Sequence, residues 1–220
     1  MWAAARDEAE HSMNAKQWSA SITPCGAGPK GGPSAGVAVC VRSHIGMRQS
    51  TVEEVKGDGL GSRFNLKWIG AAIPGGFHCG SLYMQDGVGL DHDLNTKLLH
   101  ATAARVKLLQ GPFVLAADWN GTPEQLVATG FLKLVWGHIV HPVGKTCTAG
   151  KGRVLDFFVA SLSMLPYLRG AFNVEDSGIG PHSPVRLILG GKPRDDNVRM
   201  LKVPKSHPPR PAAWPCPPIR

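Results

Sequence analysis

The stretch FVLAADWNGTPEQL, residues 113–126, indicates the fold class of this 220-residue chain. Residues 113–117 are apolar and of strand length, which favours a buried β-strand that ends at Asp118. Thr122 is followed by proline and then, three positions on, by Gln125; this is the form of a capping box with proline at the first helical position. A strand, a turn and a helix therefore follow one another closely, which favours an α/β chain.

Strands and helices are also predicted on both sides of this stretch. We expect strands at residues 35–42, 64–68, 77–83, 153–160 and 185–189, and helices at residues 3–18, 94–110 and from 123 onward. The strands at 64–68 and 77–83 are predicted to form a hairpin-like pair.

Three local features refine these predictions. Residues 35–42, AGVAVCVR, are uninterrupted small or β-branched residues, which is typical of a strand covered on both faces. Residues 23–36 are rich in glycine and proline and are expected to be a loop without regular structure. Asp91 or Asp93 is expected to be the N-cap of the helix at 94–110.

Composition and charge divide the chain into two parts. With 27 glycines and 18 prolines a helical bundle is disfavoured, while 43% hydrophobic and 18% charged residues suffice for one core, expected over residues 1–190. Residues 191–220 hold seven of the Lys and Arg residues against two Asp, together with eight prolines. We expect this segment to be a basic, disordered tail, solvated or touching polyanions.

Several protein classes are disfavoured by the sequence. The longest apolar stretch, residues 154–165, is too short for a membrane span and contains Asp156, so no membrane association is expected. The first residues are acidic where a secretory signal would be basic, which predicts an intracellular protein. Five scattered cysteines without metal-ligand spacing disfavour a zinc module and suggest reduced thiols.

Polar side chains interrupt the apolar pattern at three places. After the strand at 113–117, period-two alternation sends Asp118 and Asn120 to one side and Trp119 to the other. Taken alone, Asp118 could equally form an Asx turn before the Thr122 cap.

The other two places are Asp156 and His182. Asp156 lies inside the apolar stretch 154–159, where a carboxylate requires a partner. That partner could be His182, which stands at a turn before the last strand, or a structural arginine such as Arg153. His182 alone could be an ordinary loop histidine. We predict that Asp156 and His182 meet in the fold.

Five segments together resemble one superfamily. They are GVAV at 36–39, SLYMQD at 81–86, DWNGTPEQL at 118–126, VLDFFVAS at 154–161 and PHSPV at 181–185. In this order they resemble the GGVAI, (N/S)xYxPN, GD(F/L/W)NxxPxxL, RLDYIFVS and SDHxPV motifs of the endonuclease/exonuclease/phosphatase superfamily, which includes abasic-site endonucleases and DNase I. The local sequences of these motifs are most similar to those of divergent endonucleases of non-LTR retrotransposons.

The resemblance implies a four-layered α/β sandwich of the DNase I-like type and metal-assisted hydrolysis of a phosphodiester, with Mg²⁺ as cofactor. By motif position, Asp118 would orient or deprotonate the attacking water and Asn120 would hold a phosphate oxygen. Tyr83 would hydrogen-bond the phosphate. His182, oriented by Asp156, would contact the same phosphate or help to activate the water.

The chain also departs from the superfamily pattern. The strands expected to carry an asparagine and the metal-binding glutamate should precede the opening helix, where the sequence begins; Glu8 and Glu10 are expected to be solvated. Pro181 stands where an aspartate is expected, and Ala117 stands where a glycine is expected. We therefore expect a domain incomplete at its N-terminus, weak metal binding, and an exposed strand edge or sheet face near residues 35–42 that promotes self-association.

These observations lead to two hypotheses of function. The first is an endonuclease-like, metal-dependent phosphodiester hydrolase with feeble activity and a nucleic-acid partner, DNA more than RNA. The second is a catalytically dead remnant of a retroelement endonuclease that binds nucleic acid or a protein. No dinucleotide cofactor is expected in either case.

Overall fold

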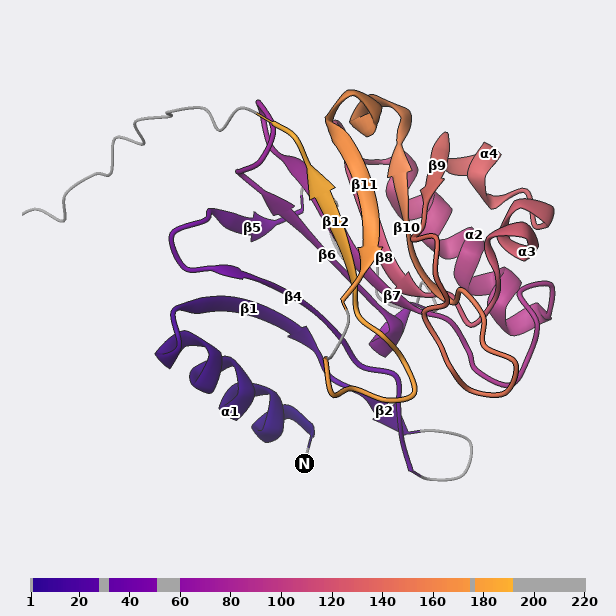
Figure 1. Ribbon diagram of the computed structural model, residues 1–220. Coiled ribbons are helices and arrows are strands. Elements are labelled where there is room, and N and C mark those ends of the chain that lie inside the picture. The colour runs from indigo at the N-terminus through magenta and orange to yellow at the C-terminus, as the bar shows by residue number, and fades with distance from the viewer. Residues whose placement is uncertain (1, 28–31, 51–59, 175–176, 192–220) are drawn as a thin grey trace, which may run out of the picture.

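The computed structural model describes residues 2–27, 32–50, 60–174 and 177–191; the remainder is drawn in grey in Figure 1. Nearly all of the predicted tail at 191–220 lies outside the described residues.

A six-stranded sheet forms the centre of the fold. Its strands, in spatial order, are β5 (Met47–Gln49), β6 (Phe64–Ile69), β7 (Phe77–Tyr83), β8 (Phe113–Asp118), β10 (Asp156–Ser161) and β9 (Gly137–Val140). β6 and β7 pair antiparallel, which confirms the predicted hairpin-like pair. β7 and β8 pair parallel, so the chain must cross over between them.

Three helices cover one face of this sheet: α2 (Asp93–Lys107), α3 (Pro123–Ala128) and α4 (Phe131–Val135). Alternate strand residues such as Leu115 and Phe157 point toward the helices and join Leu99 of α2 in one apolar core. The capping box at Thr122 is present as predicted. The N-cap of α2, however, is His92 rather than Asp91 or Asp93, since its Nδ1 accepts the Leu94 N–H at 3.3 Å.

Two short antiparallel ribbons lie on the opposite face. One consists of β1 (Trp18–Thr23) and β4 (Val37–Arg42), and the other of β11 (Leu168–Asn173) and β12 (Val185–Leu189). Side chains of both ribbons pack on the sheet in a second apolar core. α1 (Trp2–Ala15) packs against β1 on the outside (Figure 1). The layers run helix, ribbons, sheet, helices, which confirms the predicted four-layered α/β sandwich.

Four predictions of local structure need correction. The helix predicted at 3–18 ends at Ala15, and Trp18 already begins β1. The loop predicted at 23–36 contains a short ribbon of β2 (Gly26–Ala27) and β3 (Pro33–Ser34). β4 buries only one of its faces fully: on the outer face Ala38 and Arg42 are exposed and Cys40 is half-buried, because α1 packs mainly against β1. The strand predicted at 153–160 begins only at Asp156.

Some elements were not predicted from the sequence. They are β5, β9, β11, α4 and the 3₁₀ helices at Gly61–Arg63 and Leu162–Tyr167. Each of these elements is short, so its local sequence pattern is weak. Its position is determined by packing against distant parts of the chain. No described helix has the length and apolar character needed to cross a membrane.

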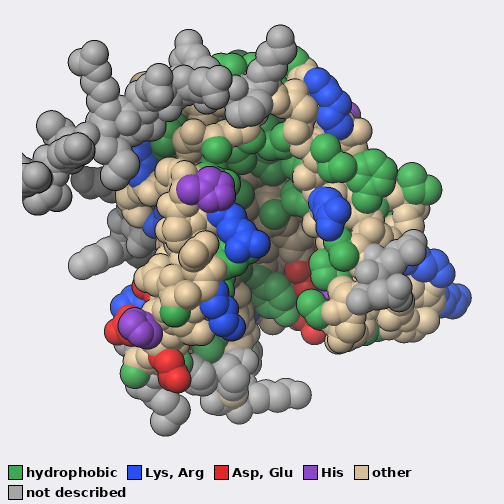
Figure 2. Space-filling view, turned by 60° about the vertical axis from the view of Figure 1, so that its left-hand side comes forward, with side chains coloured by type: hydrophobic (Ala, Val, Ile, Leu, Met, Phe, Trp, Pro, Cys, Tyr) green, Lys and Arg blue, Asp and Glu red, His purple; other side chains and the backbone are tan. Residues whose placement is uncertain are grey.

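Part of the sheet face remains open between the two ribbons. Ser81, Ala116 and Phe158 line a hollow of about 240 Å³ there, and Figure 2 shows hydrophobic side chains on its walls. In the described part of the chain β4 pairs with β1 alone, so its other edge has no strand partner. The free edge of β4 therefore lies where a free strand edge was predicted, and the open sheet face lies over β7, β8 and β10; self-association stays a prediction.

Candidate active site

The strand register brings three predicted site residues into one row. Tyr83 lies opposite Asp118 in the parallel pair β7 and β8, and Asp156 lies opposite Asp118 in the antiparallel pair β8 and β10. Directly opposed residues share one face of a sheet, so these side chains project together at the end of the strands. Two carboxylates in direct opposition repel each other, and this position requires a compensating positive charge or proton.

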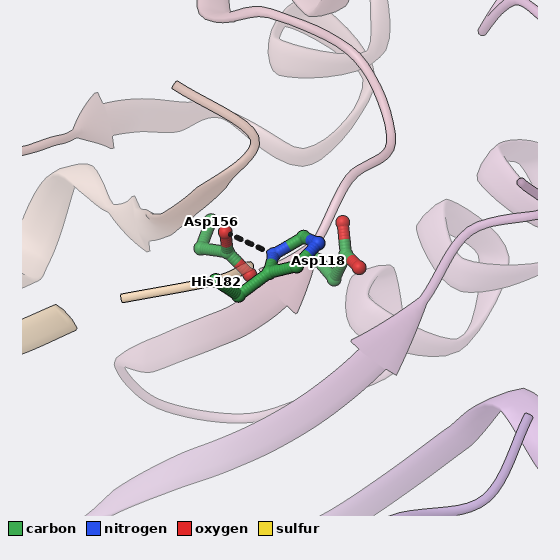
Figure 3. Close-up of side chains that lie close together, drawn as sticks. All are labelled: Asp118, Asp156 and His182. Atoms are coloured by element: carbon green, nitrogen blue, oxygen red, sulfur yellow. Dashed lines mark hydrogen bonds and ion pairs between the residues drawn. The ribbon is translucent and has the colours of Figure 1, made fainter. Parts of the chain in front are cut away.

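His182 supplies the partner that Asp156 requires. Its Nδ1 lies 2.8 Å from Asp156 Oδ2, and the ring lies between the two carboxylates (Figure 3). The side chains of His182 and Asp156 are 34% and 23% exposed, so the pair is partly shielded from solvent but accessible to a ligand. The predicted contact is confirmed. The alternative pairing is wrong, because Asp156 makes no ion pair with Arg153 within the described ranges.

A buried threonine holds these segments together. Thr146 Oγ1 accepts the backbone N–H groups of Leu155 and Asp156 at 2.8 and 2.9 Å, and its carbonyl accepts the Ser183 N–H at 2.7 Å. It thereby ties the start of β10 to the turn that carries His182. Sequence reasoning missed Thr146, since its partners lie 9 or more residues away and nothing in its local pattern indicates them.

The turn after β8 fixes the direction of Asp118. Asp118 Oδ1 accepts the Asn120 N–H at 3.0 Å, so the Asx turn is present as well as the predicted placement in the site. Asn120 has a φ of 49°, a left-handed conformation that asparagine tolerates, and its Nδ2 donates to the Met84 carbonyl at 2.9 Å. Trp119 is fully buried, and its Nε1 donates to the Phe157 carbonyl. The polar neighbours are thus separated from the indole as predicted.

The surroundings of Asp118 disfavour its charged form. Burial raises the pKa of Asp118, and the nearby Asp156 and Asp86 carboxylates raise it further. The Asn120 N–H and His182 act in the opposite direction and lower this pKa, but the net shift is upward. A carboxylate with a raised pKa is a better proton acceptor than an ordinary aspartate.

Two cavities meet at Asp118. The larger, of about 490 Å³, is lined by Tyr83, Asp118, Asn120 and His182. Asp156 lines the hollow between the ribbons, which also reaches Asp118. All five predicted site residues therefore line one or other of two cavities that share Asp118. Glu8 and Glu10 lie on α1 in another layer; Glu8 is exposed as expected, but Glu10 is half-buried and accepts the Ile22 N–H at 3.2 Å.

Tyr83 is supported from one side by an arginine that the sequence reasoning did not single out. The guanidinium of Arg63 lies 5.3 Å from the centre of the Tyr83 ring and donates to Gln85 Oε1 at 2.6 Å. Burial lowers the pKa of Arg63, which still carries its positive charge at neutral pH. The Tyr83 ring is thus held by a cation–π contact.

The side chains present fit a divalent cation. One donor atom from each of Asp118, Asp156 and His182 lies within 4.8 Å of the others. Carboxylate oxygens are the ligands that Mg²⁺ prefers, and a cation here would relieve the repulsion between the opposed carboxylates. The expectation of weak metal binding did not include this second carboxylate, because only the strand register shows that Asp156 stands beside Asp118.

Solved structures share this architecture. An AP endonuclease of Leishmania major has 14% identity and a TM-score of 0.62, with 84% of this chain and 75% of that chain covered. The catalytic domain of Xenopus laevis APE2 has 13% identity and a TM-score of 0.62, with 81% and 77% covered. The endonuclease domain of TRAS1, a telomere-specific non-LTR retrotransposon, has 14% identity and a TM-score of 0.58, with 87% and 94% covered.

The chain has the DNase I-like fold. This is the architecture that the five sequence motifs imply for the endonuclease/exonuclease/phosphatase superfamily. No protein-family model matches the sequence, and a search of the curated proteins finds no match either. In this DNase I-like domain the likeness to the solved structures lies in the fold, since the sequence identities are only 13–14%.

Proposed function

We propose that this chain is a metal-dependent phosphodiester hydrolase that cleaves nucleic acid internally. The observation that carries the proposal is the cluster of Asp118, Asp156 and His182, held within 4.8 Å at the strand ends of a DNase I-like fold. Tyr83 and Asn120 border the same cavity and supply neutral hydrogen-bonding groups. This combination of acids, imidazole and neutral donors suits hydrolysis of a phosphate ester.

Asp118 and Asp156 would hold the cation, which we propose to be Mg²⁺. When bound, the cation neutralises charge on the phosphate and favours ionisation of a water molecule. Activation of the water and the contacts to the phosphate oxygens are assigned to side chains of the protein.

Asp118 orients the attacking water and accepts its proton, the role that its motif position implies. Asp156 accepts the Nδ1–H of His182 and so leaves Nε2 toward the phosphate, where the ring contacts a phosphate oxygen. Tyr83 donates its hydroxyl to another phosphate oxygen. Asn120 donates the second hydrogen of its Nδ2, since the first is bonded to the Met84 carbonyl. These roles follow motif position and placement at the cavity.

The proposed substrate is DNA rather than RNA. Similar structures include AP endonucleases and the endonuclease domain of a telomere-specific retrotransposon. The formal charge of +8 favours a polyanionic partner. Pro181 stands where an acid is expected in the superfamily motif, so we expect slow cleavage.

The test is cleavage of supercoiled plasmid DNA and of an abasic-site duplex in Mg²⁺. The wild-type chain is expected to nick slowly, and Asp118→Asn is expected to abolish nicking. Asp93→Asn is a matched control, since Asp93 is an exposed acid on α2 outside the cavity. DNA binding without cleavage by the wild-type chain would favour the catalytically dead, nucleic-acid-binding alternative.

A further inference from the structure

Cys147 lies at the centre of a small strand-like arrangement beside the candidate active site. It forms one isolated antiparallel bridge with Arg153 and another with His182. Arg153 and His182 therefore flank Cys147 on opposite sides. All three residues line the cavity of about 490 Å³.

The hydrogen bonds give the spacing of these residues. Cys147 and Arg153 exchange both backbone hydrogen bonds at 2.9 Å, as in a hydrogen-bonded pair. Opposite His182 the bonds come from neighbouring residues, as in a non-hydrogen-bonded pair. Such pairs have Cα separations of about 5.5 and 4.5 Å, which puts Arg153 and His182 roughly 10 Å apart. Directly opposed side chains share a face, so both point into the cavity.

The charge of Arg153 has no partner among the residues that the structure describes. The side chain is exposed and has no ion pair or hydrogen bond with any described residue. It is also the one arginine or lysine among the residues that line this cavity, whose acids are Asp86 and Asp118. A guanidinium presents several donors in a planar fork that matches phosphate oxygens.

We infer that Arg153 binds a phosphate group of the substrate in the candidate active site. The inference rests on the proposed function and adds a substrate-binding residue to it. Arg153 supplies a fixed positive charge to the cavity that Tyr83 and Asn120 also line. Tyr83 and Asn120 donate neutral hydrogen bonds, whereas Arg153 pairs with the anion. Loss of this side chain is therefore expected to weaken binding.

The test is the affinity for a short fluorescein-labelled DNA duplex, measured by anisotropy in EDTA so that no cleavage occurs. Arg153→Ala is expected to weaken binding about tenfold, as for loss of a charge-assisted hydrogen bond. Arg153→Lys should fall between, since it keeps the charge and loses the fork. Lys151→Ala is the matched control: Lys151 is exposed, two residues away and outside the cavity, and its loss should change affinity less than about twofold.

A second measurement separates this inference from the proposed function. If the wild-type chain binds DNA without cleaving it in Mg²⁺, the hydrolase proposal fails, while a selective effect of Arg153→Ala on binding still supports the inference. If the wild-type chain cleaves and Arg153→Ala matches Lys151→Ala in both affinity and KM, the inference is overturned and the hydrolase proposal stands. Absence of any DNA binding by the wild-type chain overturns both.

Discussion

Replacing Trp119 with phenylalanine should destabilise the protein substantially. Trp119 is fully buried between Phe131 and Phe157, and its Nε1 donates to the Phe157 carbonyl at 3.1 Å. Without this donor the buried Phe157 carbonyl loses a hydrogen bond, which costs about 1–3 kcal/mol. The smaller ring also leaves a void, which costs about 1 kcal/mol more. We expect the free energy of unfolding to fall by about 2–4 kcal/mol, a large share of the roughly 5–15 kcal/mol typical of a domain.

Urea unfolding followed by circular dichroism measures this change, because other tryptophans would complicate fluorescence. Trp136→Phe is the matched control, since Trp136 is 77% exposed and its replacement should change the unfolding free energy by less than about 0.5 kcal/mol. If Trp119→Phe also stays within about 0.5 kcal/mol of wild type, the indole is not the anchor of the turn that carries Asp118 and Asn120.

Three further predictions concern the site and its supporting turn. Because burial raises the pKa of Asp118, the folded chain binds this proton more tightly than the unfolded chain, and the ionised carboxylate reduces stability above that pKa. Asp118→Asn should therefore raise the free energy of unfolding at pH 7 in EDTA by under about 1 kcal/mol, given solvent screening. The gain should vanish in acid, and an equal gain at both pH values contradicts this. Asp156→Asn should lower kcat about 10–100-fold, because it releases His182 and weakens cation binding. At saturating Mg²⁺ only the release of His182 remains, so the change should add little to His182→Ala in the double variant; additive losses under that condition would show that the two act separately. Thr122→Ala removes the capping box and should cost about 1 kcal/mol in thermal unfolding, and an unchanged transition would contradict the capping role.

Much of the fold follows from local sequence patterns. Residues 113–126 predict β8, the turn and α3, since an apolar strand-length run and a capping box are each encoded within a few residues. The same holds for β7 and β12. The chemistry of one contact was also predictable, because an acid inside an apolar strand requires a partner and His182 offered one.

Other features depend on which distant segments pair. The helix predicted at residues 3–18 includes Trp18, yet Trp18 pairs with Arg42 across β1 and β4. The two-sided burial predicted for residues 35–42 fails for a similar reason: composition shows that a strand is apolar, but the packing of α1 on β1 determines which face is covered.

The site itself combines both kinds of information. The sequence determined that Asp118, Asp156 and His182 were chemically conspicuous and that their motifs resemble one superfamily. Only the register between β8 and β10 decided that the two aspartates stand opposite each other, and only the segment at 146–148 decided that Arg153 and His182 flank one residue. Strand pairing fixes positions across tens of residues through backbone hydrogen bonds, and these bonds are nearly independent of side-chain identity. For that reason the tertiary structure, and not the local pattern, determined which charges share the cavity.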